Sequence, residues 1–308
     1  MTQAIIFPGQ GSQSVGMLTD IAKEFSEIPT VFTEASAILN YDLWELVVNG
    51  PASELDKTMR TQPILLTSSY AVWQILKKHA STQPQFLAGH SLGEYTALVC
   101  ADALAFSDAL KLVEARGKFM QEAVPLGVGA MAAIIGLEEN KIAEICNEVT
   151  ATNEIVSPAN FNSLGQVVIA GHTQAVQRAI NLAKERGAKL ATLLPVSVPS
   201  HCELMRPAAE RLEKMLTNIT FNSLSIPVVG NVTAMPYQSV NEIKQGLIKQ
   251  LYSPVQWVKT IQYFINQHIT QIVECGPGKV LTGLNKRIDK NLQLFSTDDY
   301  IRQAVHDE

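Results

Sequence analysis

The chain has 308 residues, of which 46% are hydrophobic and 17% are charged, and its formal net charge is −5. This composition is typical of a globular protein with a large core, and the length favours about two domains of roughly 150 residues each. The negative balance gives no general attraction for nucleic acid, so we expect no nucleic-acid partner. No apolar run approaches the roughly 20 residues that span a bilayer, so we expect no membrane association.

The four cysteines lie far apart in the sequence, at Cys100, Cys146, Cys202 and Cys275. Their spacing fits neither a disulfide framework nor a zinc knuckle, and no H-E-x-x-H motif is present. The N-terminal residues lack the basic start and the apolar run of a secretory signal. We therefore expect a cytoplasmic protein that binds no metal.

In chain order, the first part of the sequence alternates between apolar runs and helical patterns. The predicted elements are a strand at 4–7 that leads into a glycine-bearing loop at 9–11, a helix from Pro63 to His79 with the proline in its first turn, a short strand at 86–88 that stops at Gly89, a helix just after Gly93, and a helix from about 107 to 124. This order predicts a parallel sheet covered by helices.

The middle of the chain changes to a different pattern. It predicts a strand at 130–135, a helix at 138–149, strands at 154–158 and 166–170, a helix at 173–186 and a strand at 188–194. This βαββαβ order is ferredoxin-like. The first pattern then resumes, with strands at 226–229 and 270–274. We expect one large α/β domain, 1–125 and 200–308, interrupted by a ferredoxin-like subdomain, 126–199, with a ligand cleft between the two.

Residues 89–93, Gly-His-Ser-Leu-Gly, match the G-x-S-x-G nucleophile elbow of α/β-hydrolase-like folds. The elbow needs glycines because its backbone folds tightly between a strand and a helix, which exposes the serine hydroxyl at the start of that helix. Here the motif lies between an apolar strand and a predicted helix. The sequence therefore predicts an α/β-hydrolase-like large domain with Ser91 as its nucleophile; a glycine-rich surface turn is the alternative.

A serine nucleophile needs a base, and histidine is the usual one. Of the six histidines, His90 should point away from its neighbour Ser91, and His306 lies in the C-terminal tail. Ser200 and Glu203 have the spacing of a capping box, which places His201 at the start of a helix. The positive end of a helix disfavours a second positive charge, so we expect a neutral imidazole there and take His201 as the candidate base.

Arg116 falls on the apolar side of the predicted 107–124 helix, four residues from both Leu112 and Met120. A buried guanidinium is costly without an anion. Its partner is either an internal Asp or Glu or the carboxylate of a substrate, which a planar guanidinium can bind through two hydrogen bonds. The second alternative implies an acyl group that carries its own carboxylate.

With these three residues, the sequence resembles the malonyl-CoA:acyl carrier protein transacylase family over nearly its whole length. The motifs that carry the resemblance are Phe-Pro-Gly-Gln-Gly-Ser-Gln at 7–13, Gly-His-Ser-Leu-Gly-Glu-Tyr at 89–95, Arg116, Pro-Ser-His at 199–201, Gln250 and Gly-Pro-Gly-Lys-Val-Leu at 276–281. The family also has the inserted ferredoxin-like subdomain.

The resemblance implies a role for each site residue. Ser91 would carry the acyl group and His201 would be its base, with the main-chain carbonyl of Gln250 orienting the imidazole. The backbone N–H groups of Gln10 and Leu92 would form the oxyanion hole. Arg116 would bind the malonyl carboxylate. The implied reaction is a ping-pong transfer from malonyl-CoA to acyl carrier protein, in support of fatty acid synthesis, by an enzyme that we expect to be a monomer.

Two other functions remain open on the sequence. One is a serine esterase or thioesterase that uses the same elbow, and the other is a non-catalytic protein that docks to the carrier. A G-x-G-x-x-A pattern at 127–132 follows a helix rather than a strand, so we expect no dinucleotide site and no permanently bound cofactor.

Overall fold

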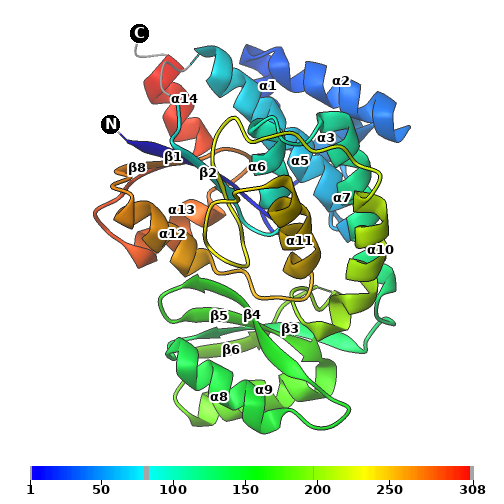
Figure 1. Ribbon diagram of the computed structural model, residues 1–308, viewed down its shortest axis with the longest axis vertical. Coiled ribbons are helices and arrows are strands. Elements are labelled where there is room, and N and C mark those ends of the chain that lie inside the picture. Colours follow the sequence, from blue (N-terminus) through cyan, green and yellow to red (C-terminus); the bar gives the residue numbers. More distant parts are fainter. Residues whose placement is uncertain (1, 80–82, 197, 306–308) are drawn as a thin grey trace.

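The computed structural model describes residues 2–79, 83–196 and 198–305. It contains two separate sheets, which Figure 1 shows with the larger one above the smaller one. No helix in these three ranges is both long and apolar enough to cross a membrane.

The larger sheet has five strands in the order β7-β2-β1-β8-β9, and every neighbouring pair is parallel. Its strands are β1 (Gln3–Phe7), β2 (Phe86–Gly89), β7 (Val228–Val229), β8 (Gln271–Glu274) and β9 (Gln293–Phe295). The expectation of a parallel sheet covered by helices is therefore confirmed. The sequence reading did not predict β9, which has only three residues and none that is fully buried.

Helices surround this sheet on both faces (Figure 1). They are α1 (Thr19–Glu24), α2 (Glu27–Leu39), α3 (Leu43–Asn49), α4 (Ala52–Leu55), α5 (Thr58–His79), α6 (Gly93–Cys100), α7 (Phe106–Glu122), the 3-10 turn η1 (Glu203–Met205), α10 (Arg206–Leu216), α11 (Val240–Gln250), α12 (Trp257–Asn266), α13 (Val280–Ile288) and α14 (Thr297–Val305).

The central strand β1 is buried along its whole length, as expected of a strand in a parallel sheet covered on both faces. Its side chains alternate between two cores because successive residues of a strand point to opposite faces. Ile5 and Phe7 join the core that contains α2, α5, α6 and α7, whereas Ala4 and Ile6 join the core that contains α12 and Trp257. The sheet is thus held from both sides, and its carboxyl edge is a rigid base for the site.

The prediction that Pro63 opens a helix is wrong, because α5 begins five residues earlier, at Thr58. Proline lacks an N–H, so the helix loses the bond that this group would give to residue 59. Burial compensates for this loss, since α5 packs closely against α7. A Cβ atom added to Gly117 of α7 would lie only 2.7 Å from the Met59 Cα.

The smaller sheet is antiparallel with the strand order β4-β5-β3-β6. In chain order its elements are β3 (Gly129–Ile135), α8 (Glu139–Val149), β4 (Val156–Ser163), β5 (Gln166–His172), α9 (Thr173–Glu185) and β6 (Leu190–Leu193). One face is covered by α8 and α9, which lie below the sheet in Figure 1. Met131 and Val168 lie on the other face, in a small apolar cluster with Cys202 of the larger part. The smaller sheet therefore packs beside His201.

Candidate active site

Ser91 lies in the tight turn between β2 and α6, with a φ of 51°. This left-handed conformation is strained for a residue with a side chain. The glycines on either side allow the close packing of the turn. A Cβ on Gly89 would lie 1.9 Å from the Gly93 carbonyl carbon, and a Cβ on Gly93 would lie 2.1 Å from the Phe7 carbonyl oxygen. The predicted strand–turn–helix context of the motif is confirmed, and the turn is not a surface loop.

The His201 side chain lies between Ser91 and Gln250. Its Nε2 is 2.8 Å from Ser91 Oγ, and its Nδ1 is 2.7 Å from the Gln250 carbonyl oxygen. A carbonyl oxygen only accepts hydrogen bonds, so in the neutral ring Nδ1 carries the proton. Nε2 is then free to accept the hydroxyl hydrogen of Ser91, which is the arrangement a general base requires.

His201 does not begin a helix, so that prediction is wrong. The residue lies in a turn with a φ of 63°, before η1, and α10 starts only at Arg206. The Ser200 hydroxyl does not cap Glu203 in the structure, because Cys202 is the residue before η1 and no side chain caps it. Packing of this turn against the smaller sheet overrides the local capping pattern.

The imidazole of His201 is neutral for a different reason. Burial and, second to it, the positive charge of Arg116 together lower the pKa of His201 to about 3. Both effects disfavour the imidazolium form. A neutral ring is thus expected as before, but it follows from desolvation and a neighbouring cation rather than from a helix end.

Arg116 lies in α7 with 1% of its surface exposed. Its Nη1 donates to Gln62 Oε1 at 2.7 Å, and its Nη2 donates to Gln250 Oε1 at 2.8 Å and to Ser91 Oγ at 3.2 Å. The guanidinium also lies 5.3 Å from the centre of the Tyr95 ring. Among the described residues, no carboxylate lies within salt-bridge distance of it, and its Nε has no hydrogen-bond partner. Neutral amide oxygens therefore hold a buried cation beside Ser91.

Gln10 and Leu92, the residues predicted to form the oxyanion hole, both lie beside the cavity that contains Ser91. Gln10 follows β1 in the loop that packs against Gly93, and Leu92 is the residue before α6. Within the described ranges, neither main-chain N–H donates to another protein atom. Both residues line the same cavity as Ser91, and neither N–H group has a protein acceptor among the described residues that would keep it from binding an oxyanion.

This cavity has a volume of about 200 Å³ and lies between the two parts of the molecule. The larger part contributes Ser91, His201 and Arg116. Apolar side chains from both parts also line it, namely Met120, Met131, Val168, Leu194, Val196 and Val198, and the smaller sheet adds the polar residues Asn160 and Asn162. A cation and a nucleophile thus share a small space with both polar and apolar walls, in the cleft where the sequence predicted a ligand.

His90 also lines this cavity, but its ring has partners other than the Ser91 hydroxyl. Its Nε2 pairs with Asn162 Oδ1 of β4 at 2.8 Å, and its ring contacts Trp257. Burial lowers its pKa. The ring of His90 therefore connects the turn to the smaller sheet and leaves the Ser91 hydroxyl to His201. His306 lies outside the described residues.

Sequence reasoning missed a buried polar cluster behind Ser91. Glu94 accepts hydrogen bonds from Tyr237 Oη, from Gln250 Nε2 and from the Asn231 backbone N–H. Burial raises the pKa of Glu94 to about 6. Glu94 lies inside the 89–95 motif, which was its only indication in the sequence. Asn231 and Tyr237 lie in none of the motifs that pointed to the site. Gln62 was overlooked because it lies 54 positions before its partner Arg116.

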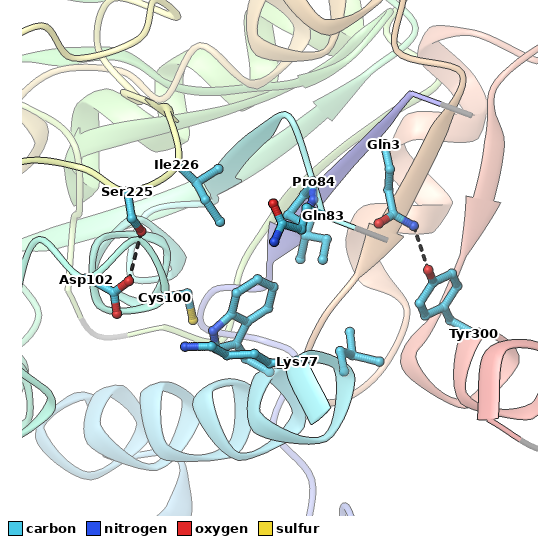
Figure 2. Close-up of a pocket in the computed structure, with 12 residues that line it drawn as sticks. Gln3, Lys77, Gln83, Pro84, Cys100, Asp102, Ser225, Ile226 and Tyr300 are labelled. Atoms are coloured by element: carbon cyan, nitrogen blue, oxygen red, sulfur yellow. Dashed lines mark hydrogen bonds between the residues drawn. The ribbon is translucent and has the colours of Figure 1, made fainter. Parts of the chain in front are cut away.

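A larger cavity of about 350 Å³ lies at the opposite, amino-terminal edge of the larger sheet (Figure 2). Four of its polar side chains form two hydrogen-bonded pairs. Gln3 Nε2 donates to Tyr300 Oη at 2.8 Å, and Ser225 Oγ donates to Asp102 at 2.9 Å. Burial raises the pKa of the Cys100 thiol well above its ordinary value, so it is not an activated nucleophile. We therefore place the candidate active site in the smaller cavity.

A serine bonded to a neutral imidazole, on a strand-to-helix turn of a parallel sheet, is the arrangement of serine enzymes that act on acyl groups. The family described as "Acyl transferase domain" matches residues 4–290 of the chain. The chain is 56% identical over 289 residues to the malonyl CoA-acyl carrier protein transacylase of Escherichia coli O157:H7, covering 94% of this chain and 93% of that protein. It is 45% identical over 296 residues to the protein of the same name from Bacillus subtilis (strain 168), covering 96% and 93%.

Comparison with solved structures leads to the same group of proteins. The malonyl CoA-acyl carrier protein transacylase of Coxiella burnetii matches with a TM-score of 0.96 at 48% identity, covering 99% of this chain and 97% of that one. A malonyl-transacylase in complex with a type II PKS acyl-carrier protein matches with a TM-score of 0.97 at 50% identity, covering 100% of both chains. The chain therefore belongs to the acyl transferase domain family and, within it, to the malonyl CoA-acyl carrier protein transacylases, which confirms the resemblance.

Proposed function

We propose that this acyltransferase moves a malonyl group from malonyl-CoA to the phosphopantetheine thiol of acyl carrier protein, through an ester on Ser91. One observation above all supports the malonyl group. The guanidinium of Arg116 is buried within 3.2 Å of Ser91 Oγ and has only neutral oxygens as partners. A carboxylate on the acyl group would supply the missing anion. The names of the relatives point to the same substrate and carrier.

The first half of the reaction forms the ester. Ser91 Oγ attacks the thioester carbonyl carbon while His201 Nε2 takes the hydroxyl proton. The carbon–sulfur bond then breaks, and His201 returns this proton to the departing sulfur of coenzyme A. The malonyl carboxylate pairs with Arg116 throughout, which fixes the carbonyl beside Oγ.

The second half reverses these steps with a new thiol. His201 takes the proton of the carrier thiol, the sulfur attacks the ester carbonyl, and the proton passes to Ser91 Oγ as the ester bond breaks. Negative charge develops on the carbonyl oxygen in both halves. The N–H groups of Gln10 and Leu92 would stabilise it, and losing one such donor typically lowers turnover by roughly 10²–10³-fold.

Several narrower assignments belong to this proposal. The strand order of the smaller sheet supports a ferredoxin-like subdomain at 126–199, and the turn at Ser91 supports an α/β-hydrolase-like domain at 1–125 and 200–308. The four cysteines are unpaired and buried, which fits a reducing cytoplasm. We also expect a monomer that acts in fatty acid synthesis without a resident cofactor, a metal or a nucleic-acid partner.

Intact-protein mass spectrometry tests the ester. After mixing with malonyl-CoA, the wild-type protein should gain one malonyl group and pass it to added acyl carrier protein, and the Ser91→Ala variant should gain none because it lacks the attacking oxygen. A full malonyl adduct on Ser91→Ala would exclude Ser91 as the acylated residue.

The same reaction mixture separates the two alternative functions. Free malonate in excess over malonyl-carrier product would indicate a thioesterase instead of a transferase. A wild-type protein that a serine-reactive fluorophosphonate does not label would indicate a non-catalytic carrier-docking protein.

A further inference from the structure

Ser91 has a backbone conformation that other contacts must maintain. A non-glycine residue with a φ of 51° is strained, and this conformation persists only where the surroundings hold it. The glycines at 89 and 93 permit the turn, but they do not hold it. The turn contains three peptide groups whose direction matters, namely those that end in the N–H groups of His90, Ser91 and Leu92.

Asn231 binds this turn from behind. It follows β7, the strand beside β2, and is 1% exposed. Its Oδ1 accepts from the Ser91 N–H at 2.7 Å, and its Nδ2 donates to the Gly89 carbonyl oxygen at 2.6 Å. One side-chain amide therefore bonds the peptide groups on both sides of His90.

The next peptide group is held in a matching way. Gln250 Nε2 donates to the Ser91 carbonyl oxygen at 2.8 Å. That oxygen and the Leu92 N–H belong to one planar trans peptide, so they point in opposite directions. Holding the oxygen on the buried side therefore directs the Leu92 N–H toward the cavity.

Asn231 and Gln250 are both hydrogen-bonded to the carboxylate of Glu94. Glu94 accepts from the backbone N–H of Asn231 at 3.2 Å and from the side chain of Gln250. Neither Asn231 nor Glu94 lines the cavity, so neither can touch a substrate. The side chain of Asn231 therefore reaches the reaction through the backbone of the turn, whereas Glu94 also contacts Gln250.

We propose that Asn231 is a positioning residue that holds the strained turn at Ser91, so that Oγ faces His201 and the Leu92 N–H faces the cavity. The proposal rests on the proposed function only in taking Ser91 as the nucleophile. It does not depend on which acyl group is transferred. Loss of the amide should therefore slow every reaction at Ser91 by a similar factor.

The rate of Ser91 labelling by a fluorophosphonate measures this effect directly. Asn231→Ala removes both hydrogen bonds, and we expect labelling to slow by about 10²-fold, the usual cost of misplacing a reacting group by about 1 Å. The ratio of malonyl to acetyl loading should stay at the wild-type value. Labelling of a folded Asn231→Ala variant at the wild-type rate would overturn the proposal.

The isosteric variant Asn231→Asp adds a readout that a merely structural role would not produce. Its new carboxyl group, when protonated, can still accept from the Ser91 N–H and donate to the Gly89 carbonyl, whereas the ionised form cannot donate. The ratio of the labelling rate of Asn231→Asp to that of the wild-type protein should therefore increase as the pH falls. A ratio that does not change with pH would contradict the assignment.

Asn285 of α13 offers a matched control. It is also a fully buried asparagine, and its Oδ1 accepts from Trp257 Nε1 at 2.9 Å, but it does not line the cavity. Asn285→Ala should lower thermal stability and leave the labelling rate unchanged. If it slows labelling as much as Asn231→Ala, the effect is general destabilisation and the proposal fails. A wild-type protein that is labelled but does not transfer malonyl would contradict the proposed function alone.

Discussion

At the scale of single residues, the charge on Arg116 is the unusual feature of the site. Two glutamines, Gln62 and Gln250, hold its guanidinium in place without neutralising it. Burial lowers its pKa, yet arginine stays charged in proteins. The side chain is therefore fixed in position, and the nearby carboxylate of Glu94 is separated from it by the Gln250 amide, so the guanidinium can still pair directly with a carboxylate.

Acyl selectivity should follow this charge. Arg116→Ala should lose the preference for malonyl over acetyl while keeping some loading by neutral acyl groups. Gln62→Glu has nearly the same shape and would place a carboxylate against Nη1, so it should also reduce malonyl loading while Ser91 still reacts with a fluorophosphonate.

The measurement is the initial rate of loading from malonyl-CoA and from acetyl-CoA. Gln62→Leu, which removes the acceptor without adding charge, is the control. Equal malonyl loss in the Glu and Leu variants would show that geometry, and not charge, sets the preference.

The pH dependence should reflect the environment of His201. Its pKa is lowered to about 3 by burial and by Arg116, so the neutral form, which accepts a proton, predominates above that pH. Activity is then lost as the pH falls through the lowered value and not near 6.5, the ordinary histidine value. A profile of kcat/KM in which a histidine titrates at or above 6.5 would contradict this assignment.

Glu94, whose pKa is raised to about 6, titrates between these values and could produce a limb of its own. Glu94→Gln keeps the side-chain shape and removes that titration. A limb near pH 6 that disappears in this variant therefore belongs to Glu94 and leaves the assignment of His201 intact.

At the scale of elements, the join between β2 and α6 depends on Gly93. A Cβ there would lie 2.1 Å from the Phe7 carbonyl oxygen, which is backbone and cannot move without displacing β1 and the Gln10 loop. Gly93→Ala should therefore cost about 1–3 kcal/mol of unfolding free energy and lower activity as well.

Urea denaturation with a fluorophosphonate labelling assay would check both effects. Gly283→Ala in helix α13 is the control, because nothing lies within 4 Å of the added Cβ. It should be neutral or stabilising by up to about 1 kcal/mol. The assignment fails if Gly93→Ala behaves in the same way as Gly283→Ala.

The helices, strands and turns also show how much of the fold could be predicted from the sequence. The parallel sheet and the strand–turn–helix around Ser91 follow from local patterns of apolar residues and glycines, and both are confirmed. The start of α5 and the turn at His201 were mispredicted because packing overrode local signals, a helical proline in one case and a capping pattern in the other. Asn231 gave no signal, because its partner Ser91 is 140 positions away.

At the scale of the whole molecule, the cavity depends on contact between the two sheets. The face of the smaller sheet opposite α8 and α9 supplies Met131 and Val168, which meet Arg116 and His201 from the larger part. Neither part alone encloses this space. The size of the acyl group should therefore depend on residues of the smaller sheet that take no part in the chemistry.

Met131→Ala should enlarge the cavity and raise loading of a branched malonyl group relative to malonyl, at a cost of about 2–5 kcal/mol in stability. Competition between methylmalonyl-CoA and malonyl-CoA, read by mass spectrometry, measures the ratio. Ile169→Ala is a matched control, because it truncates a buried side chain on the opposite face of the same sheet. An unchanged ratio in Met131→Ala, or an equal change in Ile169→Ala, would disprove the role of Met131.

The hydrogen bond from Arg116 to Ser91 Oγ places a cation close to both the hydroxyl and the imidazole that must deprotonate it. In the free enzyme this electric field weakens the base. A substrate that carries its own anion cancels much of the field, because opposite charges a few ångströms apart offset each other at a third site. If the proposed function is right, malonyl-CoA would make His201 a stronger base as it binds. Esters without a negative charge would not do so, and their hydrolysis by the enzyme would stay slow.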